Sequence, residues 1–355
     1  MKLLIRADAN EVIASGHVKR CLSIADGFTN KNIEIVFVCS EMAAENVLKG
    51  TKYRSIILEN DYREKDGEIP LLEKIIDKEY ADGILVDSYE VTEKYLSRLS
   101  QICPVAYIAT MKDINFTGEL LINYTQYAKQ KYFEEKYPKL KEKGFLLQGE
   151  KYVPLRKEFL KIPCREKKNI QNILITTGAS DPDNMSYAIL VLCMRISRLK
   201  EMNYTVVVGN YFKNIEQLRE LQQKNPNIIL EYNVSNMSEL MKRNDIAVSA
   251  GGTTLFELCA CGLPAISFSM ADNQIPMVRY FEKKGLIPYA GDERIQFAEV
   301  LDNIQNTLFS WTSKIEKVNE QSRKMQSVID GMGAQRIAEK LGVMMKGQNK
   351  WRKLF

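Results

Sequence analysis

Histidine is the scarcest of the residues that carry chemistry in this chain, with one, His17, among 355 residues. A zinc site needs a cluster of histidines or suitably spaced cysteines, and neither is evident. The seven cysteines are odd in number and mostly lie inside apolar stretches, and the spacing of Cys259 and Cys261 is not that of a metal site. We therefore expect reduced cysteines in a cytoplasmic protein, with no bound metal and no cofactor.

Long apolar runs and a strong excess of one charge are also missing. No stretch approaches the roughly 18 apolar residues of a membrane span, and the first residues lack a signal-peptide pattern. The net charge is only +5, from 50 basic and 45 acidic residues, which suits anionic small ligands better than nucleic acid. We expect no nucleic-acid partner and no stable membrane insertion, and we expect residues 346–355, with four basic side chains, to be a solvated tail. The oligomeric state stays open, a monomer being one option.

The sequence does contain two series of alternating strand and helix patterns. The first series predicts strands at 3–7, 33–39, 55–58, 83–87, 105–109 and 120–123, with helices such as 69–78 and 92–100. The second predicts strands at 173–177, 204–208, 228–232, 246–250 and 265–268, followed from about residue 297 by helices alone. Two such series predict an α/β protein with two doubly wound, Rossmann-like domains facing across a cleft. We place them at 1–160 and 161–345, joined by a linker at 154–168 and followed by the tail.

The single histidine lies where the first strand turns into the first helix. In an open α/β sheet, ligands bind at the carboxyl ends of the strands, and histidine suits acid–base catalysis near neutral pH. Gly16 is expected to let the backbone turn sharply before His17. A surface or helix-capping histidine is the alternative. We predict His17 as a catalytic base, and Gly16, Arg20 and Asp87 as candidates to contact the substrate.

A Gly-Gly pair in the second half follows a strand and opens a helix. Free backbone N–H groups at such a turn bind phosphate, which predicts ligand contacts at Gly251, Gly252, Thr253 and Thr254. Glu257 has two interpretations that its spacing does not separate. It either completes a capping box with Thr254 or accepts the hydroxyls of a ribose.

Two further loops in the second half carry polar residues after strands. In the loop at 177–184, Asp181 and Pro182 resemble an N-cap and the first helical residue, which leaves Gly178 and Ser180 for a ligand. In the loop at 271–274, two amide side chains either bind a sugar or phosphate or cap the helix that follows. They are Asn273 and Gln274.

Several of these stretches occur together in one enzyme family. They are RADAN and GHVKRCLSIA at 6–25, VDSY at 86–89, QGEKYVPLRKEF at 148–159, TTGASDPDN at 176–184, SAGGTTLFELCACGLP at 249–264, ADNQ at 271–274 and DGMGAQRI at 330–337. On these motifs the chain resembles the PseG-type nucleotide-sugar hydrolases of pseudaminic acid biosynthesis. That family is similar in fold to the GT-B glycosyltransferases.

The resemblance implies a metal-independent hydrolysis of a UDP-linked diacetamido-trideoxy hexose to UDP and free sugar. The C–O bond would break with inversion, and the product would connect the chain with flagellin glycosylation. UDP would lie against the second domain, with its ribose on Glu257, while His17 would activate water and Tyr89 would lie near the sugar. The diphosphate would be held by Gly251, Gly252, Thr253, Thr254, Asn273 and Gln274. Arg6 or Lys19 is expected to help neutralise the diphosphate.

The chain departs from the family pattern mainly on the sugar side. Where the family has an Asp-Asp pair followed by a histidine, this chain has 110–113, and Ser88 and Phe256 stand in place of a family histidine and tryptophan. Two alternatives are a glycosyltransferase that uses a UDP-sugar donor and a non-catalytic nucleotide-sugar-binding protein. The second alternative would have no use for His17 in its motif.

Overall fold

The structure is a computed structural model that describes residues 1–29, 32–109, 114–125 and 130–348. Its contacts divide the chain into two compact units. The first comprises Met1–Lys157 together with the chain from Gly331 onwards, and the second comprises Glu158–Asp330. The chain therefore passes between the units twice, the first time within the expected linker.

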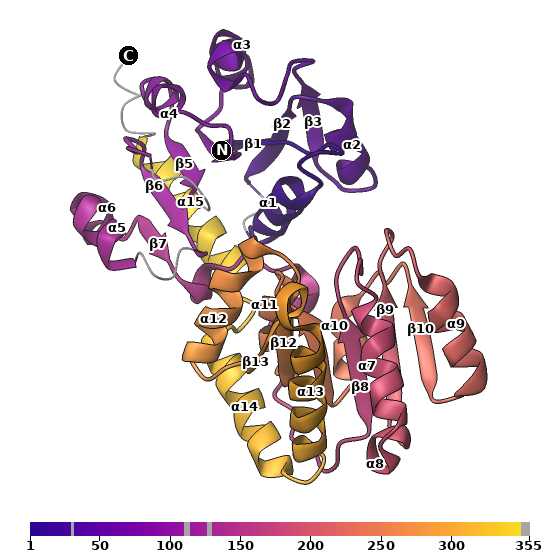
Figure 1. Cartoon of the computed structure of the whole chain (residues 1–355). Coiled ribbons are helices and arrows are strands. Elements are labelled where there is room, and N and C mark those ends of the chain that lie inside the picture. Colours follow the sequence, from indigo (N-terminus) through magenta and orange to yellow (C-terminus); the bar gives the residue numbers. More distant parts are fainter. Residues whose placement is uncertain (30–31, 110–113, 126–129, 349–355) are drawn as a thin grey trace. The chain divides into compact units, whose positions relative to one another are not determined.

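The first unit is built on a seven-stranded sheet in the order β3-β2-β1-β4-β5-β6-β7 (Figure 1). Every pairing in it is parallel. The strands are β1 (Lys2–Ala7), β2 (Glu34–Cys39), β3 (Arg54–Ile57), β4 (Gly83–Asp87), β5 (Val105–Ile108), β6 (Leu120–Asn123) and β7 (Leu146–Gln148). A parallel sheet is covered on both faces, which explains why its strands are nearly continuous apolar runs. The three residues of β7 were too few to be predicted.

Helices cover both faces of this sheet. They are α1 (Gly16–Asp26), α2 (Met42–Leu48), α3 (Lys65–Glu79), α4 (Glu93–Ser100), α5 (Gln130–Lys136), α6 (Pro138–Glu142) and α15 (Gly333–Gln348), with short 3-10 turns η2 (Glu150–Tyr152) and η3 (Lys157–Phe159), the latter at the boundary of the two units. Helix α3 begins before the predicted range of 69–78, and Pro70 lies inside it. The predicted helix at 92–100 is confirmed, and the Thr92 side chain caps it by accepting a hydrogen bond from the backbone N–H of Tyr95.

The last helix, α15, belongs to the first unit, although the sequence placed residues 331–345 in the second domain. It packs against α1, β6 and η2. Two glycines allow this close approach. A Cβ atom at Gly27 would lie 2.7 Å from the carbonyl oxygen of Ala334, and one at Gly333 would lie 2.1 Å from that of Val153. The predicted domain boundary at residue 345 is therefore wrong.

The second unit is built on a six-stranded parallel sheet in the order β10-β9-β8-β11-β12-β13. Its strands are β8 (Asn172–Thr176), β9 (Asn203–Val208), β10 (Ile228–Tyr232), β11 (Ile246–Ala250), β12 (Ala265–Ser269) and β13 (Tyr289–Asp292). The edge strand β13 was not predicted, because Gly291 and Asp292 interrupt its short apolar pattern. The other strands of both sheets lie within one or two residues of their predicted ranges.

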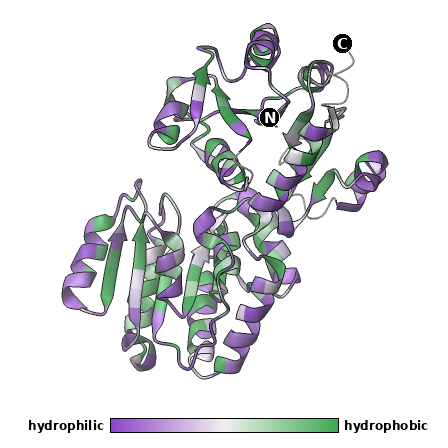
Figure 2. Cartoon of the chain, turned by 180° about the vertical axis from the view of Figure 1, so that it is seen from behind, coloured by the Kyte–Doolittle hydropathy of each residue, from purple (hydrophilic) through white to green (hydrophobic). Residues whose placement is uncertain are grey.

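The helices of the second unit complete its two outer layers. They are α7 (Met185–Met194), α8 (Ser197–Lys200), α9 (Ile215–Lys224), α10 (Met237–Lys242), α11 (Thr254–Cys261), α12 (Ile275–Lys283), α13 (Glu293–Trp311) and α14 (Ile315–Val328), with the 3-10 turn η4 (Asp272–Gln274). In Figure 2 the strands are mostly green, whereas the helices carry purple on their outer faces. From residue 297 to residue 348, where the described part ends, the only regular elements are helices, as expected.

In each parallel sheet the strand order reverses between two central strands, β1 and β4 in the first sheet and β8 and β11 in the second. The order runs outward from β1 on one side and from β4 on the other, and likewise from β8 and β11. Ligands of doubly wound sheets bind at such switch points, outside the carboxyl ends of the two central strands. His17 follows β1, and the Gly-Gly pair follows β11. The predicted fold class, two doubly wound Rossmann-like domains, is confirmed.

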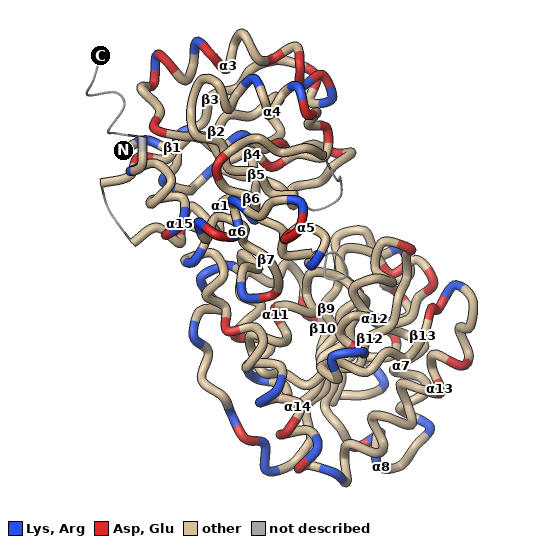
Figure 3. Tube along the Cα trace, turned by 90° about the vertical axis from the view of Figure 1, so that its left-hand side faces the viewer, with Lys and Arg blue, Asp and Glu red and all other residues tan. Residues whose placement is uncertain are grey.

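The general expectations about charge, cysteines and membrane insertion can be compared with the structure. Figure 3 shows Lys/Arg and Asp/Glu interspersed along the helices of both units, in keeping with the small net charge. The seven cysteines, all within the described residues, form no disulfide, and five of them are buried. Within the described ranges, no helix combines the length and apolar character that crossing a bilayer requires.

Candidate functional site

The region around His17 is formed where α1 begins beside the end of β4. Ala7 at the end of β1 pairs with Asp87 at the end of β4, which brings the first turn of α1 close to that carboxylate. The sharp turn before the helix is made at Ala14, whose φ is 53°, and not at Gly16 as expected. Gly16 instead leaves open space, since a Cβ atom there would have no neighbour within 4 Å.

His17 is held by Asp87. Its Nδ1 lies 2.8 Å from Oδ1 of Asp87, and both side chains are buried, with exposed fractions of 4% and 0%. Burial tends to raise the pKa of Asp87, but the nearby Arg20 and His17 outweigh it and hold the pKa at about 2. The carboxylate is therefore ionised and can only accept, so a proton on Nδ1 of His17 would donate to it. In the tautomer with the proton on Nδ1, Nε2 is the proton acceptor, which is the arrangement that suits a general base.

Arg20 completes this group on the following turn of α1. Its Nε and Nη2 donate to the two carboxylate oxygens of Asp87, its Nη2 lies 2.8 Å from Nδ1 of His17, and its Nη1 lies 3.4 Å from the hydroxyl of Tyr124. The sequence predicted that Arg20 and Asp87 contact the substrate. The geometry instead makes Asp87 a positioning residue for His17, because its carboxylate is buried and occupied by protein donors. Arg20, 17% exposed, neutralises that carboxylate.

Tyr89 lies where the sequence expected it, next to the predicted base. Its ring meets that of His17 edge-on, with centroids 4.4 Å apart and an interplanar angle of 72°. The side chain is partly exposed, at 37%, so it fixes one side of the imidazole and presents its other side outward. Ser88, which replaces a family histidine, accepts a hydrogen bond from the backbone N–H of Glu90 at 3.1 Å.

Arg6 is not available to a ligand, contrary to the prediction that it helps neutralise a diphosphate. Its guanidinium is fully buried and donates to both carboxylate oxygens of Glu68, at 2.7 Å each, and to Asp8 at 2.5 Å. Lys65 donates to the other oxygen of Asp8 at 2.6 Å. These four charges satisfy one another inside the first unit. Lys19 is exposed and stays a candidate.

A pocket in the second unit gathers most of the predicted phosphate-binding residues. It has a volume of about 320 Å³ and lies where β8, β11 and β12 end. Six of the predicted residues line it, namely Gly178, Ser180, Gly252, Thr253, Thr254 and Gln274. The rest of its lining is also uncharged, so an anion would be held here by backbone N–H groups, hydroxyls and amides.

Three features of this pocket point to a ligand. Helix α11 begins at the pocket with Thr253 as N-cap and no side-chain cap. The hydroxyl of Thr177, another lining residue, is buried without a hydrogen-bond partner, and buried polar groups of this kind usually have one. Gln274 accepts from the backbone N–H of Met270 through Oε1 at 2.9 Å, which leaves its amide N–H groups for a ligand.

The glycines of the two loops differ in what they do. A Cβ at Gly252 would meet nothing within 4 Å, so that residue leaves room for a ligand, whereas one at Gly251 would lie 2.4 Å from Cγ1 of Val278. Gly251 is thus required by packing against α12 and does not line the pocket. Gly178 has a φ of 91°, which favours glycine, and open space around it. Sequence reasoning missed Gly209, where a Cβ would lie 2.4 Å from the carbonyl oxygens of Gly178 and Ala179.

Glu257 and Asn273 lie near the pocket in sequence but outside its lining. Glu257 is half-buried on α11, and Thr254 is not the N-cap that the predicted capping box requires, because the N-cap is Thr253, whose side chain makes no cap hydrogen bond. Asn273 is exposed on η4. Phe256, the residue before Glu257, is buried with its ring centroid 5.5 Å from that of Phe281.

The prediction at Asp181 and Pro182 is half right. The Asp181 carboxylate accepts hydrogen bonds from the backbone N–H groups of Met185 and Ser186, at 2.8 and 2.9 Å, so it does cap α7. The helix nevertheless begins at Met185, and Pro182 is not its first residue. The loop therefore continues for longer than predicted before the helix starts.

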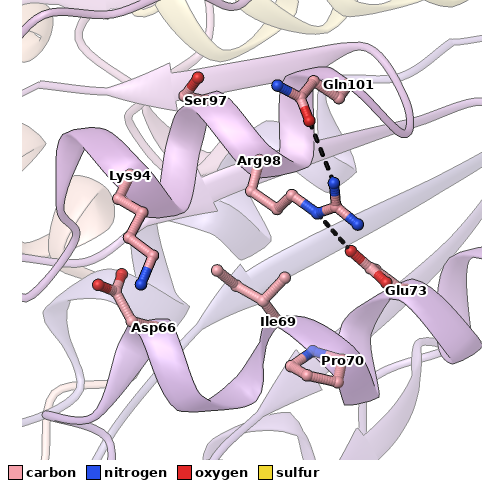
Figure 4. A pocket seen from close by; sticks show the side chains of 8 residues that line it. All are labelled: Asp66, Ile69, Pro70, Glu73, Lys94, Ser97, Arg98 and Gln101. Atoms are coloured by element: carbon pink, nitrogen blue, oxygen red, sulfur yellow. Dashed lines mark hydrogen bonds and ion pairs between the residues drawn. The ribbon is translucent and has the colours of Figure 1, made fainter.

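Another cavity, of about 450 Å³, lies in the first unit between α3 and α4 (Figure 4). Arg98 there donates to Glu73 at 2.8 Å and to Gln101 at 3.2 Å, while Lys94 and Asp66 extend toward each other. It contains none of the predicted site residues. Its larger volume is not accompanied by an unsatisfied buried polar group, so we do not regard it as the candidate site.

Three further points concern residues 110–113, metal ligands and Tyr124. Residues 110–113, where the chain departs from the family pattern, lie outside the described residues. Among the residues that the structure covers, no group of three or more His, Cys, Asp or Glu side chains has an arrangement that could hold a metal ion. Sequence reasoning also missed Tyr124, although its position just after β6, at the carboxyl edge of the sheet, was a usable signal.

Comparison with known proteins supports this architecture. Residues 165–340 match the model of the glycosyltransferase family 28 C-terminal domain. An uncharacterised protein of Methanocaldococcus jannaschii is 29% identical over 281 residues, which are 75% of this chain and 55% of that protein, so the chain spans about half of that relative. The UDP-2,4-diacetamido-2,4,6-trideoxy-β-L-altropyranose hydrolase of Campylobacter jejuni is 22% identical over 290 residues, 80% of this chain and 97% of that one.

Solved structures place the fold among the GT-B glycosyltransferases. The crystal structure of MurG from Acinetobacter baumannii superimposes with a TM-score of 0.65 at 14% sequence identity. That comparison covers 96% of this chain and 98% of MurG. The fold is thus that of the GT-B proteins over nearly the whole length of the chain.

Proposed function

We propose that this chain, whose fold is that of the GT-B proteins, hydrolyses a UDP-linked diacetamido-trideoxy hexose to UDP and free sugar. The observation that carries the proposal is the buried Asp87–His17 pair at the carboxyl edge of the sheet, in which a proton on Nδ1 would make Nε2 of His17 the proton acceptor. The similarity to the Campylobacter jejuni hydrolase, which extends over 97% of that protein, supports water as the acceptor.

The proposed reaction divides its tasks between the two units. The pocket of the second unit receives the diphosphate of UDP, and Glu257 receives the ribose. When the bond between the anomeric carbon and the phosphate oxygen breaks, the charge that develops on UDP is stabilised by the N–H groups at the start of α11. Water attacks the anomeric carbon from the opposite face and gives its proton to Nε2 of His17. The products are UDP and a sugar of inverted anomeric configuration.

The other residues support these steps. Asp87 keeps the proton on Nδ1 of His17, and Arg20 holds Asp87 in place. Tyr89, edge-on to the imidazole and partly exposed, is proposed to contact the sugar. Gly16 is proposed to let substrate approach the backbone, since nothing occupies the space where its side chain would be.

Transfer of the sugar to an acceptor hydroxyl is the second candidate function. It is favoured by the match of residues 165–340 to a glycosyltransferase family model. A general base and a UDP pocket serve both reactions, because an alcohol replaces water at the same step. The cytoplasmic location, the absence of a cofactor and the link to flagellin glycosylation stay predictions.

The two functions are separated by an acceptor-free assay. The protein is incubated with UDP-linked 2,4-diacetamido-2,4,6-trideoxyhexoses, and both UDP and free sugar are quantified. Equal release of UDP and free sugar without an acceptor supports hydrolysis. Release of UDP that requires an added alcohol supports transfer, and no release from any of these sugars with or without acceptor contradicts the proposed substrate class.

A further inference from the structure

Buried polar atoms without partners concentrate beside the pocket of the second unit, which we call the nucleotide pocket after its proposed ligand. In the part of the chain that the structure describes, seven buried side-chain oxygen or nitrogen atoms lack a hydrogen bond, and four of them belong to Thr177, Ser186 and Glu293. Thr177 opens the loop between β8 and α7, Ser186 lies in the first turn of α7, and Glu293 begins α13. Helices α7 and α13 pack side by side (Figure 1).

Glu293 is the most unusual member of this group. Both of its carboxyl oxygens lack partners, and the side chain is almost completely buried, at 2% exposure. Burial raises its pKa to about 8, and Asp181, Asp183 and Asp292 add to the rise, while Arg294 opposes it. The Arg294 guanidinium is largely committed elsewhere, since it donates to Asp292 at 2.6 Å and to Asp272 at 2.7 Å. The Glu293 carboxyl is thus mainly neutral at pH 7.

The neighbours of Glu293 connect it with the pocket. Asp181 caps α7 with both carboxylate oxygens and lies at the end of the stretch 176–180 that lines the pocket. Glu293 does not line the pocket itself. A negative charge on Glu293 would be buried against Asp181 and Asp183 without a donor to receive it, and this is strongly unfavourable. Movement of the loop away from Glu293 would relieve this repulsion.

We propose that Glu293 is a positioning residue for the nucleotide pocket and that it works in its neutral form. With the proton in place, the loop between β8 and α7 keeps the arrangement that receives a diphosphate. When the proton leaves, repulsion from Asp181 and Asp183 displaces the loop and nucleotide affinity falls. The role rests on the proposed assignment of the pocket to a nucleotide, but not on the reaction that follows.

The experiment measures UDP binding by calorimetry between pH 7 and pH 9.5. If only the neutral form binds, a pKa of about 8 predicts that affinity falls about 30-fold over this range, because the neutral fraction falls by that factor. Glu293→Gln, which keeps the shape and cannot ionise, should bind UDP with an affinity that changes less than about threefold. Glu299→Gln, an exposed position on the same helix, is the matched control and should follow the unmodified protein.

A second variant keeps the test independent of how well Glu293→Gln folds. Asp183 is exposed, and removing its charge makes ionisation of Glu293 easier. Asp183→Asn should therefore lose UDP affinity at a lower pH than the unmodified protein. The same pH dependence in all variants would overturn the proposal. Recovery of UDP affinity at high pH on adding Mg²⁺ or K⁺ would also overturn the proposal, because it would mean that the Glu293 carboxylate binds a cation and does not work in its neutral form.

Failure of this role and failure of the proposed function look different. UDP binding with the expected pH dependence but no hydrolysis would leave the role of Glu293 intact and reject the hydrolase. Hydrolysis together with a UDP affinity that does not change with pH would support the hydrolase and reject the role of Glu293. If the unmodified protein bound no UDP at pH 7, both the pocket assignment and the role of Glu293 would be wrong.

Discussion

Replacing Asp87 by asparagine tests the positioning of the proposed base most specifically. Asparagine keeps the size and shape of the side chain but removes the charge that binds Nδ1 of His17 and both donors of Arg20. Its amide can donate to Nδ1, which would favour a ring whose proton lies on Nε2. A ring in that form cannot accept a proton from water, so turnover should fall by about 10²- to 10⁴-fold.

The structure also sets the expected effect of this replacement on stability. The pKa of Asp87 is about 2 in the folded protein, whereas the ordinary pKa of an aspartate side chain is 3.8. A difference of about 1.8 corresponds to about 2.4 kcal/mol of folding free energy at neutral pH. Because the pKa is lowered, this contribution is present above pH 3.8 and disappears as the pH falls through 2. The variant should thus be less stable by about 2 kcal/mol at pH 7, with a gap that closes toward acid.

Three measurements on one preparation check this prediction. Urea denaturation gives the stability gap, a UDP-sugar assay gives turnover, and ¹⁵N NMR of the imidazole gives the tautomer without ambiguity, because His17 is the only histidine. UDP affinity should not change, since the proposed nucleotide pocket belongs to the other unit. Asp77→Asn, at an exposed position of α3, is the control and should change none of these quantities. Full turnover of Asp87→Asn, or an unchanged tautomer, would refute the reasoning.

Other replacements extend the test to the remaining predicted residues. His17→Ala should lose at least about 100-fold in turnover at unchanged UDP affinity, and it should also melt earlier, because the side chain proved to be buried. Gly252→Ala should weaken UDP binding about tenfold, the equivalent of one phosphate hydrogen bond, without lowering the melting temperature. Gly251→Ala should instead destabilise the fold by about 1–3 kcal/mol through its contact with Val278. Glu257→Gln should weaken UDP binding at constant melting temperature, and normal UDP affinity of this variant would contradict the proposed contact with the ribose.

Local patterns in the sequence were sufficient to predict most of the framework. Apolar runs marked the long strands, and the glycines and polar residues that follow them marked the loops at the carboxyl edges. These are local signals, so they located His17 and Gly252 correctly at the switch points of the two sheets. They failed at β7 and β13, where three or four residues, one of them a glycine, carry too little pattern.

The contacts that give the site its chemistry are long-range and could not be read from local patterns. Asp87 lies 70 residues from His17, and only the pairing of β1 with β4 brings them together. Arg6 was expected to help neutralise a diphosphate, but Glu68, 62 residues away, takes up its guanidinium. The return of α15 to the first unit depends on the close approach at Gly27 and Gly333, which a single sequence does not reveal.

The measurement that tests the central claim most directly is hydrolysis in ¹⁸O-labelled water with a chelator present. A UDP-linked diacetamido-trideoxy hexose is the substrate, and mass spectrometry locates the label in the products. The account predicts label in the free sugar and none in UDP, because water attacks the anomeric carbon and the protein alone stabilises the leaving diphosphate. Label in the phosphate of UDP, or turnover that stops when metal is removed, would contradict it.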